Sequence, residues 1–198
     1  MWRKQFVLIF LVLGSMHAHS QVKNIMTVRV EPGALLWTDS DNLGLLLNVE
    51  PNINILEKFV IGLRFGIAVN SQKFEGDQST QFTIDGQNDN AILSFIPTFD
   101  YYLNFNYTRP YLGLGLGYYV LSTIDVSQPG PSILDGSINN QIGVLLRGGL
   151  EHGKIRFGFE YNYVPKADII IPDGQIVGAV ENAYYGVSVG FRIGGGKL

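Results

Sequence analysis

Glycine and large apolar residues alternate with a period of two along residues 109–121, which read RPYLGLGLGYYVL. That period is typical of a β-strand, whose successive side chains point to opposite faces. The apolar face consists of Leu112, Leu114, Leu116, Tyr118 and Val120, and the other face of Gly113, Gly115 and Gly117 with Tyr111 and Tyr119 at its ends. The second face is neither polar nor bulky. It therefore predicts a strand with lipid against its leucines and long polar side chains from opposite strands above its glycines.

Seven other stretches alternate in the same way. They predict strands at 24–31, 43–53, 59–70, 91–105, 141–151, 155–164 and 185–193, and residues 109–121 make the eighth. Pro51 predicts a bend or bulge near one rim, and Pro97 predicts the loss of one ladder bond. Charges within these strands fall on the face opposite to the apolar one. They are Arg29, Glu31, Glu50, Arg64, Asp100, Arg147, Glu151, Arg156, Glu160 and Arg192.

The connections between these strands alternate between longer and short. The longer ones are predicted at 36–42, 71–90, 122–140 and 165–182, and the short ones at 56–58, 106–108 and 152–154. An even number of antiparallel strands with this asymmetry is typical of bacterial outer-membrane barrels, whose short turns face the periplasm. The sequence therefore predicts an all-β fold, an eight-stranded antiparallel up-and-down transmembrane β-barrel.

The first 20 residues have the layout of a secretory signal peptide. Arg3 and Lys4 precede an apolar run at 6–13, and small residues follow it. A transmembrane anchor is the rival interpretation, but this run is too short to cross about 30 Å of hydrocarbon. We expect cleavage after Ser20, which leaves one barrel domain at 21–198 and localises the protein to the cell outer membrane.

Composition excludes several classes of function. The chain has no cysteine, so disulfides and thiolate metal sites are impossible. It has 14 basic and 17 acidic residues, and loss of the signal peptide makes the balance more acidic. A mildly acidic chain argues against a nucleic-acid partner. No phosphate-binding loop is present, because the glycines of residues 113–117 lie within a strand, and we expect no cofactor.

The inward charges predict an ion-pair network in the lumen, because an unpaired charge in a narrow lumen is costly. An eight-stranded barrel is just wide enough for side chains to fill it. A plug of ion pairs that keeps the barrel rigid is the favoured interpretation, and a narrow gated pore is the alternative. The predicted network is Arg29, Glu50, Arg64, Asp100, Arg147, Glu160 and Arg192.

The sequence offers no catalytic constellation and no metal site. His152 is the one histidine of the mature chain, and it falls in a short turn on the predicted periplasmic side. A general base at the outer rim is therefore missing. The predicted outer loops are rich in acidic residues, but none has the twelve-residue spacing of a calcium loop. We expect these loops to stay solvated.

Aromatic residues gather near both ends of the predicted strands and predict two belts at the membrane surfaces. The candidates are Tyr101, Phe105, Tyr107 and Tyr111 near the short turns, and Trp37, Tyr118, Tyr163 and Tyr185 near the long loops.

Three stretches carry a resemblance to a known family. They are FIPTFDYYLNFNYTRPYLGLGLGYYV at 95–120, GLEHGKIRFGFEYNYVP at 149–165 and YYGVSVGFRIGGGK at 184–197. With the signal peptide, they resemble the outer-membrane protein β-barrel domain family, and the architecture is similar to the small OmpA and OmpX-type barrels. The resemblance implies an eight-stranded barrel in a Gram-negative outer membrane and implies no particular activity.

The leading hypothesis is a non-enzymatic integral barrel with a structural or surface-interaction role through its long acidic loops. Its expected partners are outer-membrane lipids, the barrel-assembly machinery during insertion, and a surface ligand or protein that the sequence does not identify. A narrow pore for small solutes is one alternative. A soluble periplasmic carrier of the lipocalin type is another, although the inward charges speak against an apolar interior.

Overall fold

The computed structural model describes residues 26–38, 43–72, 83–84, 88–121, 124–127, 133–170 and 176–195. The predicted signal peptide lies outside the described residues. The described residues include no α-helix with the length and apolar character of a membrane span.

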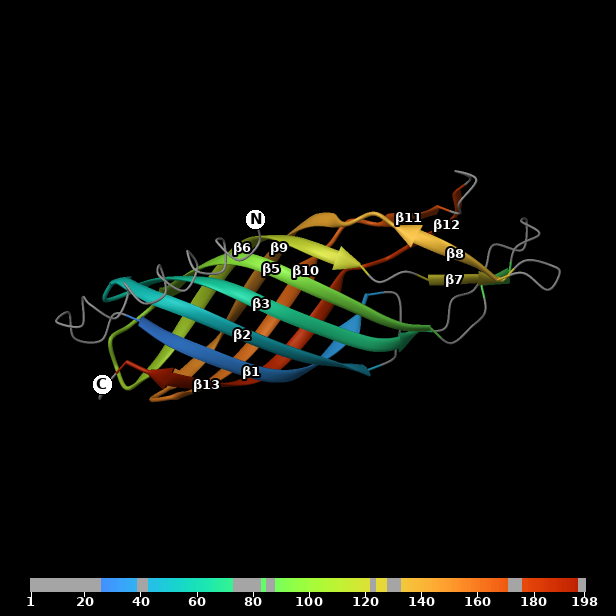
Figure 1. Cartoon of the computed structure of the whole chain (residues 1–198). Helices are drawn as coiled ribbons and strands as arrows, with labels where there is room; N and C mark the ends of the chain where they lie inside the picture. The colour runs from blue at the N-terminus through green and yellow to red at the C-terminus, as the bar shows by residue number, and fades with distance from the viewer. Residues whose placement is uncertain are drawn as a thin grey trace, which may run out of the picture.

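Eight antiparallel strands close into a barrel in the order β1-β13-β10-β9-β6-β5-β3-β2 (Figure 1). The two chain ends of the barrel meet, because β1 pairs with β13. The strands are β1 (Met26–Trp37), β2 (Leu43–Leu56), β3 (Phe59–Gln72), β5 (Asn88–Tyr102), β6 (Thr108–Leu121), β9 (Gln141–His152), β10 (Ile155–Tyr163) and β13 (Tyr184–Gly194). The predicted fold class is confirmed.

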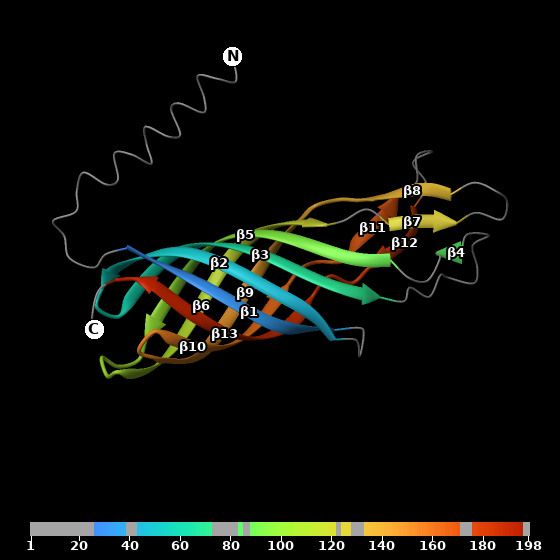
Figure 2. The same ribbon diagram turned by 60° about the horizontal axis from the view of Figure 1, so that its bottom comes forward.

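A second sheet of five short strands stands beyond one end of the barrel, opposite the short turns and the C-terminus (Figures 1 and 2). Its order is β12-β11-β8-β7-β4. The strands are β4 (Thr83–Ile84), β7 (Ile124–Ser127), β8 (Ile133–Ile138), β11 (Ala167–Ile170) and β12 (Ile176–Val180). The prediction that these stretches are plain loops is wrong, because four of these strands continue the hairpins that connect β6 to β9 and β10 to β13.

Several strand ends differ from their predicted positions, and the strand pairing explains the ends of β1 and β5. β1 continues to Trp37, so the predicted loop at 36–42 begins too early. β5 ends at Tyr102 and not at Phe105. Both differences follow from pairing: Trp37 still has a partner in Tyr184 of β13, whereas the β5–β6 pairing ends at Tyr102 and Tyr111.

The two prolines act on the ladders without shifting them. The β2–β3 pairs pass from Val49 to Asn52 in unchanged register, and the shift predicted at Pro51 falls instead between Asn54 and Leu56. Pro97 interrupts one ladder as predicted: the β5–β6 pairs skip from Phe95 to Thr98. A proline has no N–H to donate, and the neighbouring strand pairs hold the register.

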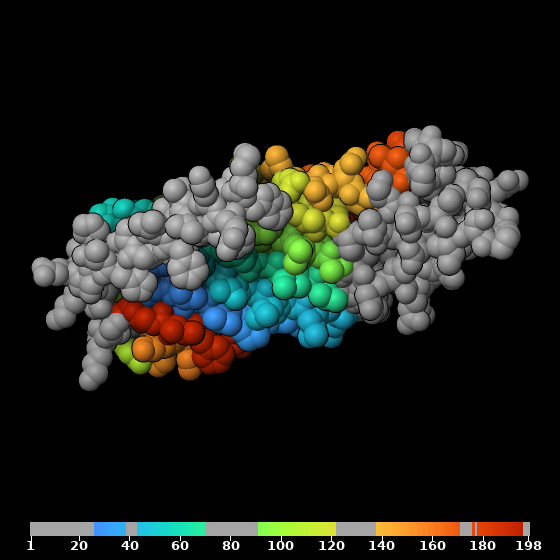
Figure 3. Space-filling model, in the orientation of Figure 1, coloured from blue at the N-terminus to red at the C-terminus, as the bar shows by residue number. Residues whose placement is uncertain are grey.

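The outward and inward faces follow the sequence parity around the whole wall. Large apolar side chains such as Leu45, Leu114 and Phe157 are exposed, whereas most charged side chains of the barrel strands are buried. The space-filling view shows side chains of β1, β2 and β13 packed side by side along one face (Figure 3). The barrel therefore has an apolar exterior and an interior that holds ionised groups, the inverse of a lipocalin-type carrier.

Candidate functional site: the barrel lumen

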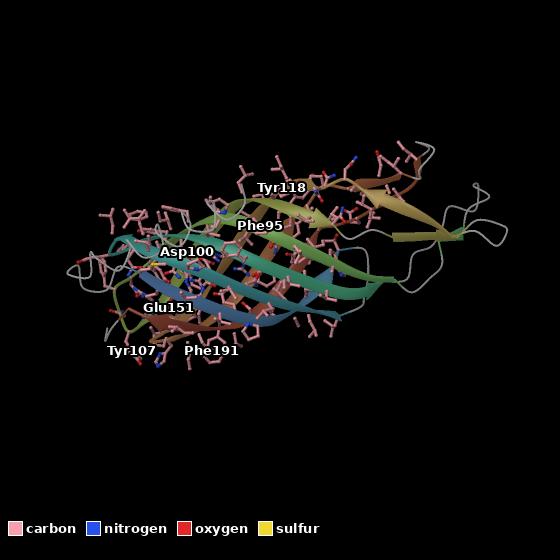
Figure 4. The ribbon with its side chains drawn as sticks, in the orientation of Figure 1. Phe95, Asp100, Tyr107, Tyr118, Glu151 and Phe191 are labelled. Carbon is pink, nitrogen blue, oxygen red and sulfur yellow. The ribbon has the colours of Figure 1, made fainter. Side chains whose placement is uncertain are left out.

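Eight buried charges form one cluster in the half of the barrel that ends in the short turns. Asp100 lies in this half in Figure 4. The cluster, called the ionic cluster below, consists of Arg29, Glu31, Glu50, Arg64, Asp100, Arg147, Arg156 and Glu160. Six strands contribute to it, with four arginines and four carboxylates. The formal charges cancel, which is the condition for keeping ionised groups inside a narrow lumen.

Asp100 accepts hydrogen bonds from three arginines of the cluster. Its Oδ2 accepts hydrogen bonds from Arg29 Nη1 at 2.7 Å and Arg156 Nη1 at 3.0 Å, and its Oδ1 accepts one from Arg147 Nε at 2.8 Å. Glu50 takes both Nη atoms of Arg147, at 2.5 and 2.9 Å. Charge-assisted, two-point contacts of this kind fix both position and orientation, so the cluster ties opposite walls of the barrel together.

Glycines on the inward face give these long side chains their room. A methyl group at Gly113 would collide with Asp100 and Arg147, and one at Gly190 would meet Glu31. The prediction of polar side chains above the glycines of β6 holds at Gly113. It is wrong at Gly115 and Gly117, which face the apolar Ile96 instead.

The structure brings together six of the seven residues predicted as a network, namely Arg29, Glu50, Arg64, Asp100, Arg147 and Glu160. Arg192 is separate, because it lies at the short-turn end and pairs with Glu151 at 3.1 Å. Glu31 and Arg156 also belong to the ionic cluster, although the predicted network does not include them. Both residues lie on the inward face by the period-two alternation, and this alternation could have identified them.

A smaller cluster lies closer to the short turns, around Glu151, which Figure 4 labels in this part of the barrel. Its carboxylate pairs with Arg109 at 2.6 Å and with Arg192. Tyr102 Oη donates to Glu151 Oε2 at 2.7 Å and accepts a bond from Arg156 Nη1 at 3.3 Å. Tyr102 therefore connects the smaller cluster to the ionic cluster.

The outer half of the lumen is apolar, whereas the sequence predicts only the ion-pair network inside the barrel. The filling, called the apolar plug below, consists of Leu35, Trp37, Leu46, Ala68, Ile92, Ile96, Tyr119, Leu121, Leu145, Val164, Ala167 and Tyr184. Trp37 and Tyr184 pack edge to face with ring centroids 5.2 Å apart. A cavity of about 10 Å³ at its mouth, lined partly by Trp37 and Glu181, is about the size of one water molecule.

One chain of hydrogen bonds connects the apolar plug to the ionic cluster. Tyr119 Oη donates to Asn162 Oδ1 at 2.8 Å, and Asn162 Nδ2 donates to Glu160 Oε1 at 2.9 Å. Glu160 also pairs with Arg64. The lumen is therefore filled at two successive levels, first by ion pairs and then by apolar side chains.

A comparison of the sequence with protein-family models and with curated proteins finds no match. Solved structures do match. Neisserial surface protein A superposes with a TM-score of 0.53 at 14% identity over 85% of this chain and 94% of that one. OprG of Pseudomonas aeruginosa gives 0.53 at 14% identity, over 86% and 97%. The chain has the fold of the small outer-membrane barrels. A third match, the outer membrane enzyme PagL, has a TM-score of 0.49 at 16% identity, over 84% and 98%.

His152 makes structural contacts at the short-turn end of this barrel. Its Nδ1 lies 2.6 Å from Thr108 Oγ1, and its ring packs edge to face on Tyr107, with centroids 4.7 Å apart. The backbone N–H of Gly153, in the same turn, donates to the Tyr107 carbonyl at 3.1 Å. These contacts hold two neighbouring turns together.

Two of the predicted belt residues are not on the membrane face. Trp37 and Tyr111 are each 2% exposed and lie in the lumen. The alternation places both side chains on the inward face, whereas the prediction relied only on their position near a strand end. Other candidates point outward: Phe105 and Tyr107 are exposed near the short turns, and Tyr118, Tyr163 and Tyr185 are exposed toward the other end.

The acidic residues of the predicted outer loops are largely outside the described residues. Among those described, Glu181 pairs with Lys166 at 2.7 Å.

Proposed function

We propose that the protein is an integral outer-membrane barrel without catalytic activity, which contacts a ligand or protein at the cell surface through its outer loops and five-stranded sheet. The filled lumen carries this proposal. Ion pairs and the apolar plug occupy successive levels of the barrel, so the interior serves stability, and the part that projects beyond the barrel is left for recognition.

The apolar exterior supports membrane insertion. Leu112, Leu114 and Leu116 are each more than half exposed, and such a band is stable against lipid rather than water. Export by the signal peptide at 1–20 is part of the same proposal. The soluble lipocalin-type carrier is disfavoured by this exterior, and the narrow pore is disfavoured by the filled lumen.

Fractionation tests the location, and gel mobility tests the fold. The protein is expected in the outer-membrane fraction, and its unboiled form is expected to migrate differently from its boiled form, because folded barrels of this type resist detergent until heated. Recovery in the soluble periplasmic fraction would contradict the proposal.

Protease added to intact cells tests the surface role. Cleavage is expected within 122–140 and 165–182, while the barrel strands remain protected. Planar-bilayer recordings distinguish the pore, since the filled lumen predicts no stepwise conductance for the folded protein. Regular single-channel steps would favour the pore.

A further inference from the structure

A groove of about 290 Å³ lies on the lipid-facing wall at β1, β2 and β3, near the short-turn end. Its walls come from outward apolar side chains, with Met26, Ile61 and Leu63 between 41% and 50% exposed. The volume approaches the lower end of ligand pockets, about 300 Å³. A cavity that is apolar and open to hydrocarbon fits an acyl chain rather than a polar solute.

Pro51 is one of the residues that line the groove. In the β1–β2 register it stands beside Val28, and the next outward row joins Met26 to Ile53. Ile53 in turn pairs with Ile61 of β3. The proline ring is compact beside the larger aliphatic side chains of this wall, and the β2–β3 pairs skip this position.

A cation stands at the end of the same hairpin. Lys58 lies in the β2–β3 turn, and its Nζ donates to the Leu103 carbonyl at 3.3 Å and lies 4.5 Å from the Phe105 ring centroid. An ammonium group has three donors, so two remain for another acceptor. At about 3.3 Å per residue, Ile61 is roughly 10 Å along the strand from Lys58. The ammonium lies on the β5 side of β3 and the groove on the β2 side, so a lipid that contacts both lies across β3.

We propose that the groove and Lys58 together bind one phospholipid with an anionic headgroup, from the leaflet that faces the short turns. An acyl chain occupies the groove beside Pro51, and the headgroup phosphate contacts Lys58 Nζ. The separation along the strand matches the order of a lipid, with its phosphate at the membrane edge and its chain deeper. Glu57, the neighbouring acid of the turn, weakens the attraction without removing it.

Native mass spectrometry of the full chain, purified and delipidated in detergent, tests this site. The protein is titrated with phosphatidylglycerol and with phosphatidylcholine of the same acyl length. One bound phosphatidylglycerol is expected, held more tightly than phosphatidylcholine. Lys58→Ala is expected to weaken the binding of phosphatidylglycerol about fivefold, which is the effect of one basic side chain near a membrane surface. Glu57→Gln is expected to strengthen it.

Filling the groove tests the other half of the site. Pro51→Leu is expected to weaken the binding of both lipids, because the leucine side chain would occupy the groove. Leu63→Phe serves the same purpose should Pro51→Leu fail to fold, as judged by heat-dependent gel mobility. Lys154→Ala, at the β9–β10 turn, is the matched control and is expected to bind as wild type.

Three results would overturn the proposal. Equal affinity for the two lipids would reject the anionic headgroup. Wild-type binding by a folded groove-filling variant would reject the groove. An equal loss in Lys58→Ala and Lys154→Ala would indicate diffuse surface charge rather than a site.

Discussion

Arg147 reaches across the lumen from β9 to Glu50 on β2, and its two Nη atoms lie 2.5 and 2.9 Å from the two carboxylate oxygens. The two residues are 97 positions apart in the chain. Because β2 and β9 are not neighbours in the barrel, this contact braces the cross-section, and ladder bonds alone could not do so.

Loss of one charge from this pair is expected to be strongly destabilising. Glu50→Gln removes one of the two carboxylates that Arg147 and Arg29 share and leaves them only Asp100. Removal of one partner of a buried pair costs about 3–5 kcal/mol. Urea unfolding in lipid vesicles measures the loss. Glu57→Gln at the exposed turn is the control and should unfold close to wild type, within about 0.5 kcal/mol. A wild-type midpoint for Glu50→Gln would contradict the bracing role.

Removing both partners is expected to cost less than the two single substitutions combined. In Glu50→Gln with Arg147→Met, neither charge of the pair remains, so the double variant should recover part of the loss. A coupling energy of about 0.5–3 kcal/mol is expected from residues in one network. Strict additivity in the same unfolding assay would mean that the pair does not act as a unit.

Gly113 and Gly148 provide a matched test of the crowded interior. Gly113→Ala forces a methyl group against Asp100 and Arg147, and overpacking of this kind costs typically about 1–3 kcal/mol. A methyl group at Gly148 meets the end of the Leu112 side chain at 3.2 Å, which can move. Thermal unfolding in detergent should therefore rank Gly113→Ala below Gly148→Ala, and the reverse ranking would contradict the cluster geometry.

A charge on the outer wall is expected to cost most at the middle of the membrane. Leu114→Arg places a cation on the lipid face halfway along β6, with an expected cost of about 2–4 kcal/mol. Leu43→Arg, at the outer end of β2 where the leucine is 75% exposed, should cost about 0–1 kcal/mol. Refolding yield into vesicles and urea unfolding report both, and equal costs would argue against a depth-dependent lipid contact.

Period-two alternation predicted most of the barrel, because each strand has one lipid face and one lumen face. Parity placed Leu114 outside and Asp100 inside, and the short turn at 152–154 fixed one hairpin. The same parity held the signal for the apolar plug, since Leu46 and Leu145 have inward positions. The inward charges predict ion pairs because an unpaired buried charge is costly, whereas inward leucines carry no such constraint.

Two features depend on three-dimensional pairing and had no comparable signal. The strands of the five-stranded sheet, such as β8, are short. β11 pairs with β8 through Ile169 and Ile138, which are far apart in the sequence. Arg192 has the parity of a network residue but lies near the short turns, so its height along the axis, not its face, selects Glu151. Parity gives the face of a residue, whereas register between distant strands gives its level.

Tryptophan quenching by brominated lipids tests most directly which surface meets hydrocarbon. The sequence holds two tryptophans, Trp2 in the predicted signal peptide and Trp37 in the lumen. Trp37 in the mature protein is therefore expected to resist quenching in brominated vesicles. A variant with Trp37→Phe and Leu114→Trp is expected to be strongly quenched. Strong quenching of Trp37 together with protection of the tryptophan at position 114 would contradict the account.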